Sequence, residues 1–572
     1  MKRVFLPLFV ALLALTACGA DNKASDNDNI TEDTLTIESM ELAGDNCPVG
    51  GMKIEEGLDT DSSGVLEEDE ISRTYYDCYD SYYYNYGANP DFVFDQTMYV
   101  GAVNPDDTDS WYSFAMEGSY PTTAADIDLL STAAGTFTAH VSFSPDMSGI
   151  QATESCPLIA NNPQVTVTQS GTVSLDEQSF PVCVIAGRFT NDTTLSNQVI
   201  WSLEDQVLVG TGNALQSTFT AFDTTVLTIA EGTVFMNQAA SSLVITRGSR
   251  IEAVGTADHP IVMSGIATPD NFGGDQEWGG LILQGYGYNN TCGSYYDDSS
   301  LCNRIGEGDS GYFGGINNAD SSGSLKYVII TEAGQEVSNG DELNGIGFMA
   351  VGYGTTIDYV QIHGNKDDGV EFFGGAVDAK HLVLTGNQDD DIDWDEGYVG
   401  NIQYALVIKY QNQDRSSNHV FELDTQGDAA ESAYQESNPT IANITAIVDL
   451  DTATYGSGAL GDGIHLKMGS EGRFFNSVLL GDMENCVFIE DDTVESTVAD
   501  DNNGVIDSVF QNIYCNATNT LENNSTYALN SLNTDTSPTL TNTLAYPVSN
   551  VPAVAISSAE MSDSSGRIPI AW

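Results

Sequence analysis

Positive charge is scarce in this sequence of 572 residues, which has 17 Lys and Arg against 83 Asp and Glu. The formal net charge of -66 disfavours nucleic acid as a partner, because a polyanion repels phosphate. Anionic membrane surfaces and acidic polymers are disfavoured too, unless cations bridge them. Proline is also scarce, with 16 residues beside 55 Gly and 26 Tyr, and this balance favours strands and turns over helices.

Several common catalytic motifs are missing. The sequence has no P-loop, GxSxG, HExxH or protein kinase signature, and no CxxC with the spacing of a thiolate zinc site. No run beyond the N-terminus is long and apolar enough to span a membrane. Hydrophobic residues nevertheless make up 41% of the chain, which excludes a disordered acidic tail and predicts a large core.

The N-terminus has the pattern of an exported lipoprotein. Two basic residues precede an apolar run of 12 residues, Val4 to Leu15, which is too short to span a bilayer. The next residues, through Gly19, resemble a bacterial lipobox. That resemblance implies a signal peptide over residues 1–17 and a lipid on Cys18; an ordinary secretory signal is the alternative.

The residue after the lipidated cysteine indicates a destination. Gly19 is not the Asp that retains enteric lipoproteins in the inner membrane, so the resemblance implies anchoring in the outer membrane, on the periplasmic or the outer surface. Residues 18–45 are rich in Asp, Asn, Thr and Ser, so they are predicted to form a flexible tether.

The cysteines agree with an exported chain. Apart from Cys18 there are eight, and they fall into four neighbouring pairs. An even number in an exported protein favours disulfides over metal thiolates. Eight cysteines allow 105 connectivities, so proximity alone suggests the pairing. The predicted disulfides are Cys47–Cys78, Cys156–Cys183, Cys292–Cys302 and Cys486–Cys515.

Residues 46–82 contain a loop with the ligand spacing of an EF-hand. Gly64 stands at the sixth position, where the loop turns sharply, and short helices are expected on either side. Extracellular calcium modules bind weakly, so calcium is expected to have a structural role. An acidic surface turn is the alternative. The predicted calcium ligands are Asp59, Asp61, Ser63, the carbonyl of Val65, Glu67 and Glu70.

Residues 88–150 alternate loosely between apolar and polar side chains, as at Phe92–Phe94, and are predicted to be rich in strands. Beyond them the chain repeats. Residues 365–372 match residues 387–394 at an offset of 22, with a short apolar strand before each copy. Hairpin dipeptides are scarce, which argues against an antiparallel sandwich. Residues 151–560 are therefore predicted to form an all-β, right-handed parallel β-helix solenoid.

This part of the sequence resembles a family of proteobacterial exported lipoproteins with parallel β-helix bodies and no assigned biochemical role. The resemblance supports the fold and the location, covers residues 150 to 480, and implies no catalytic residues. It rests on Cys156-Pro157, Phe180–Cys183, Leu243–Ser249, Trp278–Leu283, Asn344–Ile346 and Asp367–Gly375.

The 22-residue offset predicts that acidic side chains lie above one another. Asp368 lies over Asp390 and Glu371 over Asp393, about one strand spacing of 4.8 Å apart. Carboxylates this close repel each other unless a proton or cation intervenes. We consider a solvated acidic face, a calcium site between coils, and the acid–base pair of a glycan-cleaving enzyme.

A lyase would also need a base to take a proton. The basic residues and histidines of this region are Lys366, Lys380, Lys409, Arg415, Lys467, Arg473, His363, His381 and His465, although they could simply neutralise the acids. We therefore predict a non-enzymatic, calcium-stabilised protein of the outer membrane that binds a polysaccharide or a surface protein. A polysaccharide lyase or glycoside hydrolase on the same fold is the alternative.

Overall fold

The computed structural model divides into two compact units, residues 1–83 and residues 84–572. The residues it describes are 34–41, 51–58, 70–78, 87–104, 111–116, 145–175, 177–216, 225–265, 278–292, 302–338, 341–411, 419–426, 436–450, 461–490, 505–515, 517, 519–523 and 528–535.

The first unit contains a three-stranded antiparallel sheet of β1 (Thr34–Glu41), β2 (Gly51–Leu58) and β3 (Ile71–Cys78), in that order. The loop predicted to bind calcium therefore joins two paired strands, and the expected flanking helices are wrong. Aromatic and β-branched residues such as Tyr75, Tyr76 and Ile71 favour the strands. Strand β1 lies inside the segment predicted to be a tether.

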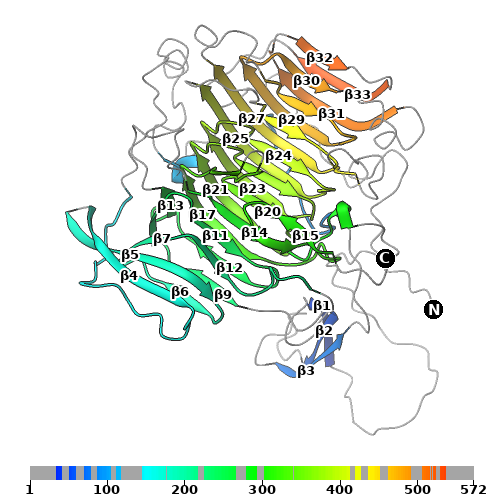
Figure 1. The fold of residues 1–572 in the computed structure, drawn as a ribbon. Helices are drawn as coiled ribbons and strands as arrows, with labels where there is room; N and C mark the ends of the chain where they lie inside the picture. The colour runs from blue at the N-terminus through cyan, green and yellow to red at the C-terminus, as the bar shows by residue number, and fades with distance from the viewer. Residues whose placement is uncertain are drawn as a thin grey trace, which may run out of the picture. The chain divides into compact units, whose positions relative to one another are not determined.

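The second unit is a parallel β-helix whose coils stack one above another (Figure 1). Each coil passes through three faces. On the first face the strands β6 (Thr193–Leu195), β9 (Val226–Ile229) and β12 (Arg250–Val254) pair in parallel. On the second face β5 (Gln178–Phe189) pairs with β7 (Ile200–Leu203), and β10 (Val234–Asn237) and β13 (Ile261–Gly265) follow.

From β17 (Gly323–Thr331) onward, one long strand crosses both of these faces, since its first half pairs with β12 and its second half with β13. The later long strands are β21 (Thr356–His363), β23 (Asp378–Thr385), β25 (Asn401–Gln411), β27 (Thr440–Leu450), β29 (Arg473–Gly481), β31 (Val505–Cys515) and β33 (Ala528–Asp535).

The third face carries short strands with a parallel register throughout. They are β8 (Gln206–Val209), β11 (Ser242–Ile245), β14 (Leu281–Gln284), β20 (Ile346–Met349), β22 (Val370–Phe373), β24 (Ile392–Asp395), β26 (Phe421–Leu423), β28 (Ile464–Leu466), β30 (Asn485–Ile489) and β32 (Asn519–Asn523).

The long strands bend between the first and second faces at a residue with positive φ. Such a conformation turns the chain without adding residues, and it puts two neighbouring side chains on the outside of the bend. The bend residues stack in a column from coil to coil: Tyr327, Tyr359, His381, Tyr404, Asn443, Asn476 and Asn512. Within this column the rings of Tyr359 and His381 are stacked, with centroids 4.3 Å apart.

Apolar side chains fill the interior of the coils. On the third face Val370 and Phe372 are fully buried, whereas Glu371 between them points outward, as strand alternation requires. Phe372 stacks on Phe348 of the preceding coil, with ring centroids 4.9 Å apart. Burying a side chain of this kind contributes about 1.5–3 kcal/mol, and the repetition from coil to coil therefore supplies most of the driving force for stacking.

The offset of 22 residues is confirmed where the repeat is regular. Val370 pairs with Ile392 on the third face, and Thr356 pairs with Asp378 on the first. The following coils are longer, because Ile392 pairs with Phe421 and Phe421 pairs with Ile464.

The body begins with an antiparallel hairpin of β4 (Val165–Leu175) and β5, whose end continues into the first coil. Two further antiparallel pairs project from the coils: β15 (Arg304–Gly306) with β16 (Gly311–Phe313), and β18 (Glu336–Ser338) with β19 (Asp341–Glu342). Short 3-10 helices occupy Trp111–Phe114 and Asn290–Cys292.

A segment before the coils, residues 87–104 and 111–116, lies along their outer surface; we call it the strap. The prediction that residues 88–150 are rich in strands is wrong for the strap, which has no strand. Its apolar side chains instead pack against the coils, as Phe94 does against Ala442 and Phe475. Its backbone bonds to coil side chains, for example Ala102 N–H to Thr445 Oγ1 at 2.8 Å. The side-chain acceptors of the coils replace a strand partner.

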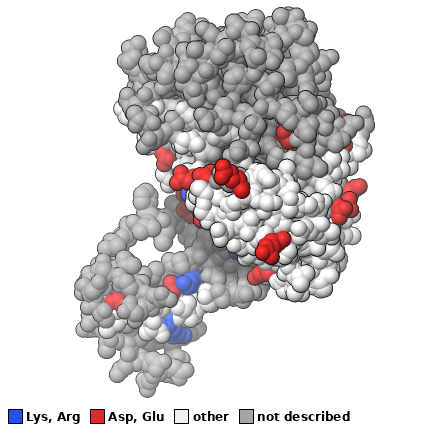
Figure 2. Space-filling view, turned by 90° about the vertical axis from the view of Figure 1, so that its left-hand side faces the viewer, with Lys and Arg blue, Asp and Glu red and all other residues white. Residues whose placement is uncertain are grey.

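On the side of the coils shown in Figure 2, most of the described surface is uncharged and the Asp and Glu side chains gather in a few separate groups. Other carboxylates are buried in the turns between strands, including those of Asp368, Asp390 and Asp391. Part of the negative charge of this chain is therefore held inside the fold, where it needs hydrogen bonds, protons or cations.

Candidate functional site

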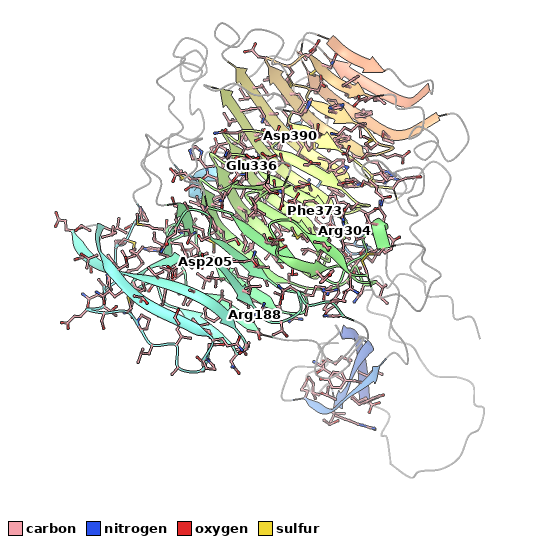
Figure 3. All side chains as sticks on the ribbon, viewed as in Figure 1. Arg188, Asp205, Arg304, Glu336, Phe373 and Asp390 are labelled. Carbon is pink, nitrogen blue, oxygen red and sulfur yellow. A yellow bond between two sulfur atoms is a disulfide. The ribbon has the colours of Figure 1, made fainter. Side chains whose placement is uncertain are left out.

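The acidic residues of the repeat come together on the third face, as predicted. Glu371 in β22 pairs directly with Asp393 in β24, and Asp393 pairs with Glu422 in β26. We call these three residues the acidic column. Phe373 and Asp390, labelled in Figure 3, mark the two coils that carry its first two members.

Asp368 and Asp390 occupy the turns that lead into these strands. The backbone N–H of Asp390 donates to Asp368 Oδ1 at 2.9 Å, and the backbone N–H of His419 donates to Asp390 Oδ1. The turn between Asp368 and β22 is tight, since a Cβ on Gly369 would lie 2.6 Å from the carbonyl oxygen of Asp391. Each turn carboxylate thus accepts a hydrogen bond from the next coil.

The predicted asparagine ladder is present beside these turns. The backbone N–H of Asn365 donates to Asn387 Oδ1 at 3.2 Å, and both residues are buried. Asn387 in turn donates through Nδ2 to Asp391 Oδ1 at 3.0 Å. The ladder holds successive acidic turns in register.

The acidic residues are less exposed than a solvated face requires. Glu371 and Asp393 are half-buried, whereas Asp368 is 7% and Asp390 2% exposed. The expectation that all four face outward is therefore wrong for the two turn residues. They turn inward because their oxygens bond the neighbouring turn, which strand alternation alone does not predict.

Burial raises the pKa of all four carboxyl groups well above the ordinary range. After burial, the largest cause is a neighbouring carboxylate in each case: Asp367 for Asp368, Glu307 for Glu371, and Glu422 for both Asp390 and Asp393. Burial, followed by the charge of Glu396, raises the pKa of Asp395 to about 7. In the absence of cations, this face therefore holds protons at neutral pH.

Two sets of carboxylates are close enough to share a cation. Asp368, Glu371 and Asp393 each offer an oxygen within 4.8 Å of the others, and so do Asp367, Asp368 and Asp389. Calcium takes six to eight oxygen ligands at about 2.3–2.6 Å in irregular geometry, so carboxylates at this spacing suit it. Of the four residues predicted to form a cation site, three fall in the first set, while Asp390 holds the turn.

Sequence reasoning did not single out two other acids. Glu307 comes from the turn between β15 and β16, and burial raises its pKa well above the ordinary value, followed by the charge of Asp367. Nothing in the repeat places that hairpin on the acidic column, so no sequence signal could have found Glu307. Asp367 and Asp389 did carry a signal, because they share the 22-residue offset.

The basic residues of the region are mostly engaged. Lys409 is fully buried, 3.3 Å from Asp391 Oδ2, and also donates to the carbonyl of Asp389. Lys380 pairs with Asp95 of the strap at 3.1 Å. Arg415 lies outside the described residues. Arg473 bonds the carbonyl of Asn438.

Lys467 alone of these lies against the acidic column, 3.0 Å from Glu422 Oε1 and 3.7 Å from Asp424 Oδ2. Burial alone would lower the pKa of Lys467, but the carboxylates of Asp424 and Glu422 raise it above its ordinary value. Lys467 is therefore an ammonium at neutral pH and a poor proton acceptor.

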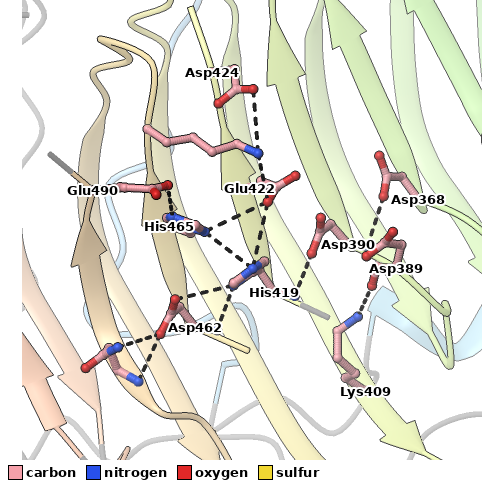
Figure 4. Close-up of polar contacts among 12 residues, drawn as sticks. Asp368, Asp389, Asp390, Lys409, His419, Glu422, Asp424, Asp462, His465 and Glu490 are labelled. Carbon is pink, nitrogen blue, oxygen red and sulfur yellow. Dashed lines mark hydrogen bonds and ion pairs between the residues drawn. The ribbon is translucent and has the colours of Figure 1, made fainter. Parts of the chain in front are cut away.

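The column continues into a pair of histidines. His465 in β28 pairs with Glu422, and His419 precedes β26 (Figure 4). Burial lowers the pKa of His419 to about 2 and also lowers that of His465, so both imidazoles are neutral. His419 was not singled out from the sequence, because its coil is longer than 22 residues and hides it from the repeat.

Three of the four predicted disulfides are confirmed: Cys156–Cys183, Cys292–Cys302 and Cys486–Cys515. The fourth pair stays a prediction, because Cys47 lies outside the described residues. So do the lipidation site Cys18 and the proposed calcium ligands Asp59, Asp61, Ser63, Val65 and Glu67; of the loop, only Glu70 is described, directly before β3. Among the described residues, no helix is long and apolar enough to cross a membrane.

Comparisons with known proteins match both units. A model of a domain of unknown function (DUF7151) matches residues 34–78, the stretch from β1 to β3. No curated protein sequence and no solved structure matches the chain. A model of the pectate-lyase-like β-helix domain matches residues 187–547, more than half of the chain and most of its coils. The chain therefore belongs to the family of proteins with a pectate-lyase-like β-helix domain.

Proposed function

We propose that this protein binds a polysaccharide along the third face of its β-helix through calcium ions held by the acidic residues. The observation that carries the proposal is the set of Asp368, Glu371 and Asp393, whose oxygens lie within 4.8 Å of one another on an outward side of the coils. Membership in a pectate-lyase-like family supports a carbohydrate as the ligand.

Calcium fits this set better than magnesium does. Magnesium demands near-ideal octahedral geometry and keeps several waters, whereas calcium accepts irregular oxygen cages. The carboxylates compete with protons, since their pKa values are raised, and a divalent ion bound between them would favour the charged forms. A calcium ion with unfilled positions can also take hydroxyl or carboxylate oxygens of a sugar.

The location and the second calcium site belong to the same proposal. A lipid on Cys18 would anchor the chain in the outer membrane, with residues 18–33 as the tether before β1. The loop Asp59–Glu70 would hold one calcium ion between β2 and β3, through Asp59, Asp61, Ser63, the carbonyl of Val65, Glu67 and Glu70. That ion would stabilise the first unit, since the loop closes a pair of strands.

The test compares polysaccharide binding with calcium and with a chelator. Neutral and acidic polysaccharides are immobilised, and retention of the full chain is measured. The expected result is calcium-dependent retention that Glu371→Gln with Asp393→Asn abolishes. Glu204→Gln is the matched control, because Glu204 is an exposed acid between β7 and β8 on an early coil. Equal retention of both variants would reject the third face as the binding surface.

A glycoside hydrolase is the second candidate, and the pKa of Asp395 favours it. A carboxyl group with a pKa of about 7 is suited to act as a general acid at neutral pH, beside carboxylates that could act as bases. A lyase is less well supported, because Lys467 stays charged. Assays for reducing ends and for unsaturated products separate the two reactions. Reducing ends that disappear in Asp395→Asn would favour the hydrolase over a pure binding protein.

A further inference from the structure

A second kind of metal site lies on the third face, beyond the carboxylates. His419, Glu422 and His465 each direct one possible ligand atom to a common point, and these atoms lie within 4.8 Å of one another. Glu422 and His465 are register partners in β26 and β28, while His419 stands directly before β26. Figure 4 shows the two imidazoles facing each other beside Glu422.

The three separations suit a small transition-metal ion. His419 Nε2 and His465 Nδ1 are 3.3 Å apart, and Glu422 Oε1 is 3.8 Å from the first and 3.9 Å from the second. Ligand atoms of a tetrahedral zinc site, with bonds of about 2.0–2.1 Å, lie about 3.3–3.5 Å apart. A shift of a few tenths of an ångström by Glu422 would therefore complete the triangle.

We propose that His419 Nε2, His465 Nδ1 and Glu422 Oε1 bind a divalent transition metal, with zinc as the best fit and solvent in the fourth position. Two imidazoles and one carboxylate form a ligand set that zinc accepts readily and that calcium, an oxygen-seeking ion, does not. This site is independent of the proposed calcium sites and of polysaccharide binding.

Outer carboxylates support both histidines. Glu490 Oε2 lies 3.3 Å from His465 Nε2, on the side of the ring away from the metal. Asp462 Oδ2 lies 3.5 Å from His419 Nδ1, and Asn485 donates to the other oxygen of Asp462 at 2.8 Å. Carboxylates in these positions orient metal-bound imidazoles and increase their basicity.

The hydrogen bonds also define what changes when the metal binds. The backbone N–H of Asp462 donates to His419 Nδ1 at 2.8 Å, so in the metal-free chain the proton of this ring is on Nε2, facing His465 Nδ1. Metal binding moves that proton to Nδ1, where it is donated to Asp462 Oδ2. The imidazole keeps one proton, and the Nε2 lone pair goes to the metal.

Lys467 is the group that the metal must displace from Glu422. Its ammonium lies 3.0 Å from Glu422 Oε1 and 3.7 Å from Asp424 Oδ2. When Glu422 turns to the metal, Lys467 keeps Asp424 as its partner. Replacing this lysine with an uncharged residue should therefore tighten metal binding, because it removes both the competing cation and a repulsive charge.

The experiment is a titration of the metal-free full chain with zinc in the presence of millimolar calcium. The expected result is one zinc ion per chain that calcium does not displace. His465→Gln and His419→Asn should each weaken it at least tenfold, Lys467→Met should strengthen it, and His259→Gln, on an early coil, is the control. Circular dichroism establishes that each variant is folded.

Cobalt gives an independent readout that requires no variant. Bound in the same place, Co²⁺ should show the visible absorption of a four-coordinate site with nitrogen ligands. The proposal is overturned if no zinc binds at 50 equivalents, if both histidine variants keep full affinity, or if bound cobalt shows only the weak spectrum of an octahedral oxygen site.

Discussion

Asp368 accepts a hydrogen bond through Oδ1 from the backbone N–H of Asp390, the residue in the same place one coil later, at 2.9 Å. The same carboxylate offers a ligand atom to both proposed cation sets. One side chain thus connects the turn framework of the coils to the acidic surface, and the two roles can be separated by substitution.

Asp368→Asn should leave the fold intact, because the amide oxygen still accepts the N–H of Asp390. Asp368→Ala should destabilise the protein by about 1–3 kcal/mol, the cost of leaving a buried donor without a partner. Urea unfolding in the presence of a chelator measures both. Equal losses in the two variants would show that the hydrogen bond contributes little.

The metal-free protein should lose stability as the pH rises from about 4 to 8. Burial raises the pKa of Asp378 and Asp395 to about 7 in the folded chain, whereas an unfolded Asp has a pKa of about 3.9. The folded state therefore holds protons that the unfolded chain releases, so this stability is complete below pH 4 and is lost as the pH passes 7. Urea midpoints measured across this range test the direction, and a midpoint that rises with pH would contradict it.

Calcium should raise the melting temperature at pH 8 and have little effect at pH 5, where protons occupy the carboxylates. At a hundred times the dissociation constant a ligand of the folded state adds about 2.7 kcal/mol. Glu371→Gln with Asp393→Asn should remove this gain and stabilise the metal-free protein, since it relieves repulsion. Glu204→Gln should behave as the wild type; a calcium response kept by the double variant would place the ion elsewhere.

The calcium loop of the first unit makes a separate prediction. Glu70→Gln should weaken one calcium site of the full chain, because a bidentate carboxylate at the twelfth loop position becomes a neutral amide. Isothermal titration of wild type and variant compares the number of sites. If both bind the same number of ions with the same affinity, the loop is an acidic turn and no calcium site.

All four cysteine pairs should be oxidised in the exported protein. Peptide mapping without reduction should link Cys47 to Cys78, in addition to the three disulfides described above. A free thiol at either position after alkylation of the native protein would refute the fourth pair. It would also weaken the argument for an oxidising compartment, which depends on the even number of cysteines.

The sequence predicts the β-helix well where the repeat is regular. The offset of 22 residues placed Glu371 over Asp393 correctly, because stacked coils of equal length keep the same side chain in the same place. It failed where coils differ in length: His419 joins the acidic column only because β26 pairs with β28 across a long coil. Periodicity also predicts which side of a strand faces outward, but not the depth of a turn residue such as Asp390.

Strand propensity misled the prediction for the strap. Phe92 and Phe94 alternate with Val93 as in a strand, yet no neighbouring strand edge is open to them along the coils that the structure describes. Phe94 is buried against Ala442 and Phe475, and the backbone of Asp95 bonds the side chain of Gln403. Alternation reports that one side of a segment is buried, and it does not identify what covers that side.

The strap has a mechanical consequence for the solenoid. Coils normally contact only their neighbours, so such a protein can unravel from either end one coil at a time. Residues of the strap bond Gln361 in β21, Asp378 in β23 and Gln403 in β25. They also bond Asn443 in β27 and Asn476 in β29. Five successive coils are therefore fastened by one strand of chain, and a force that peels the last coil must first break contacts that reach back to β21.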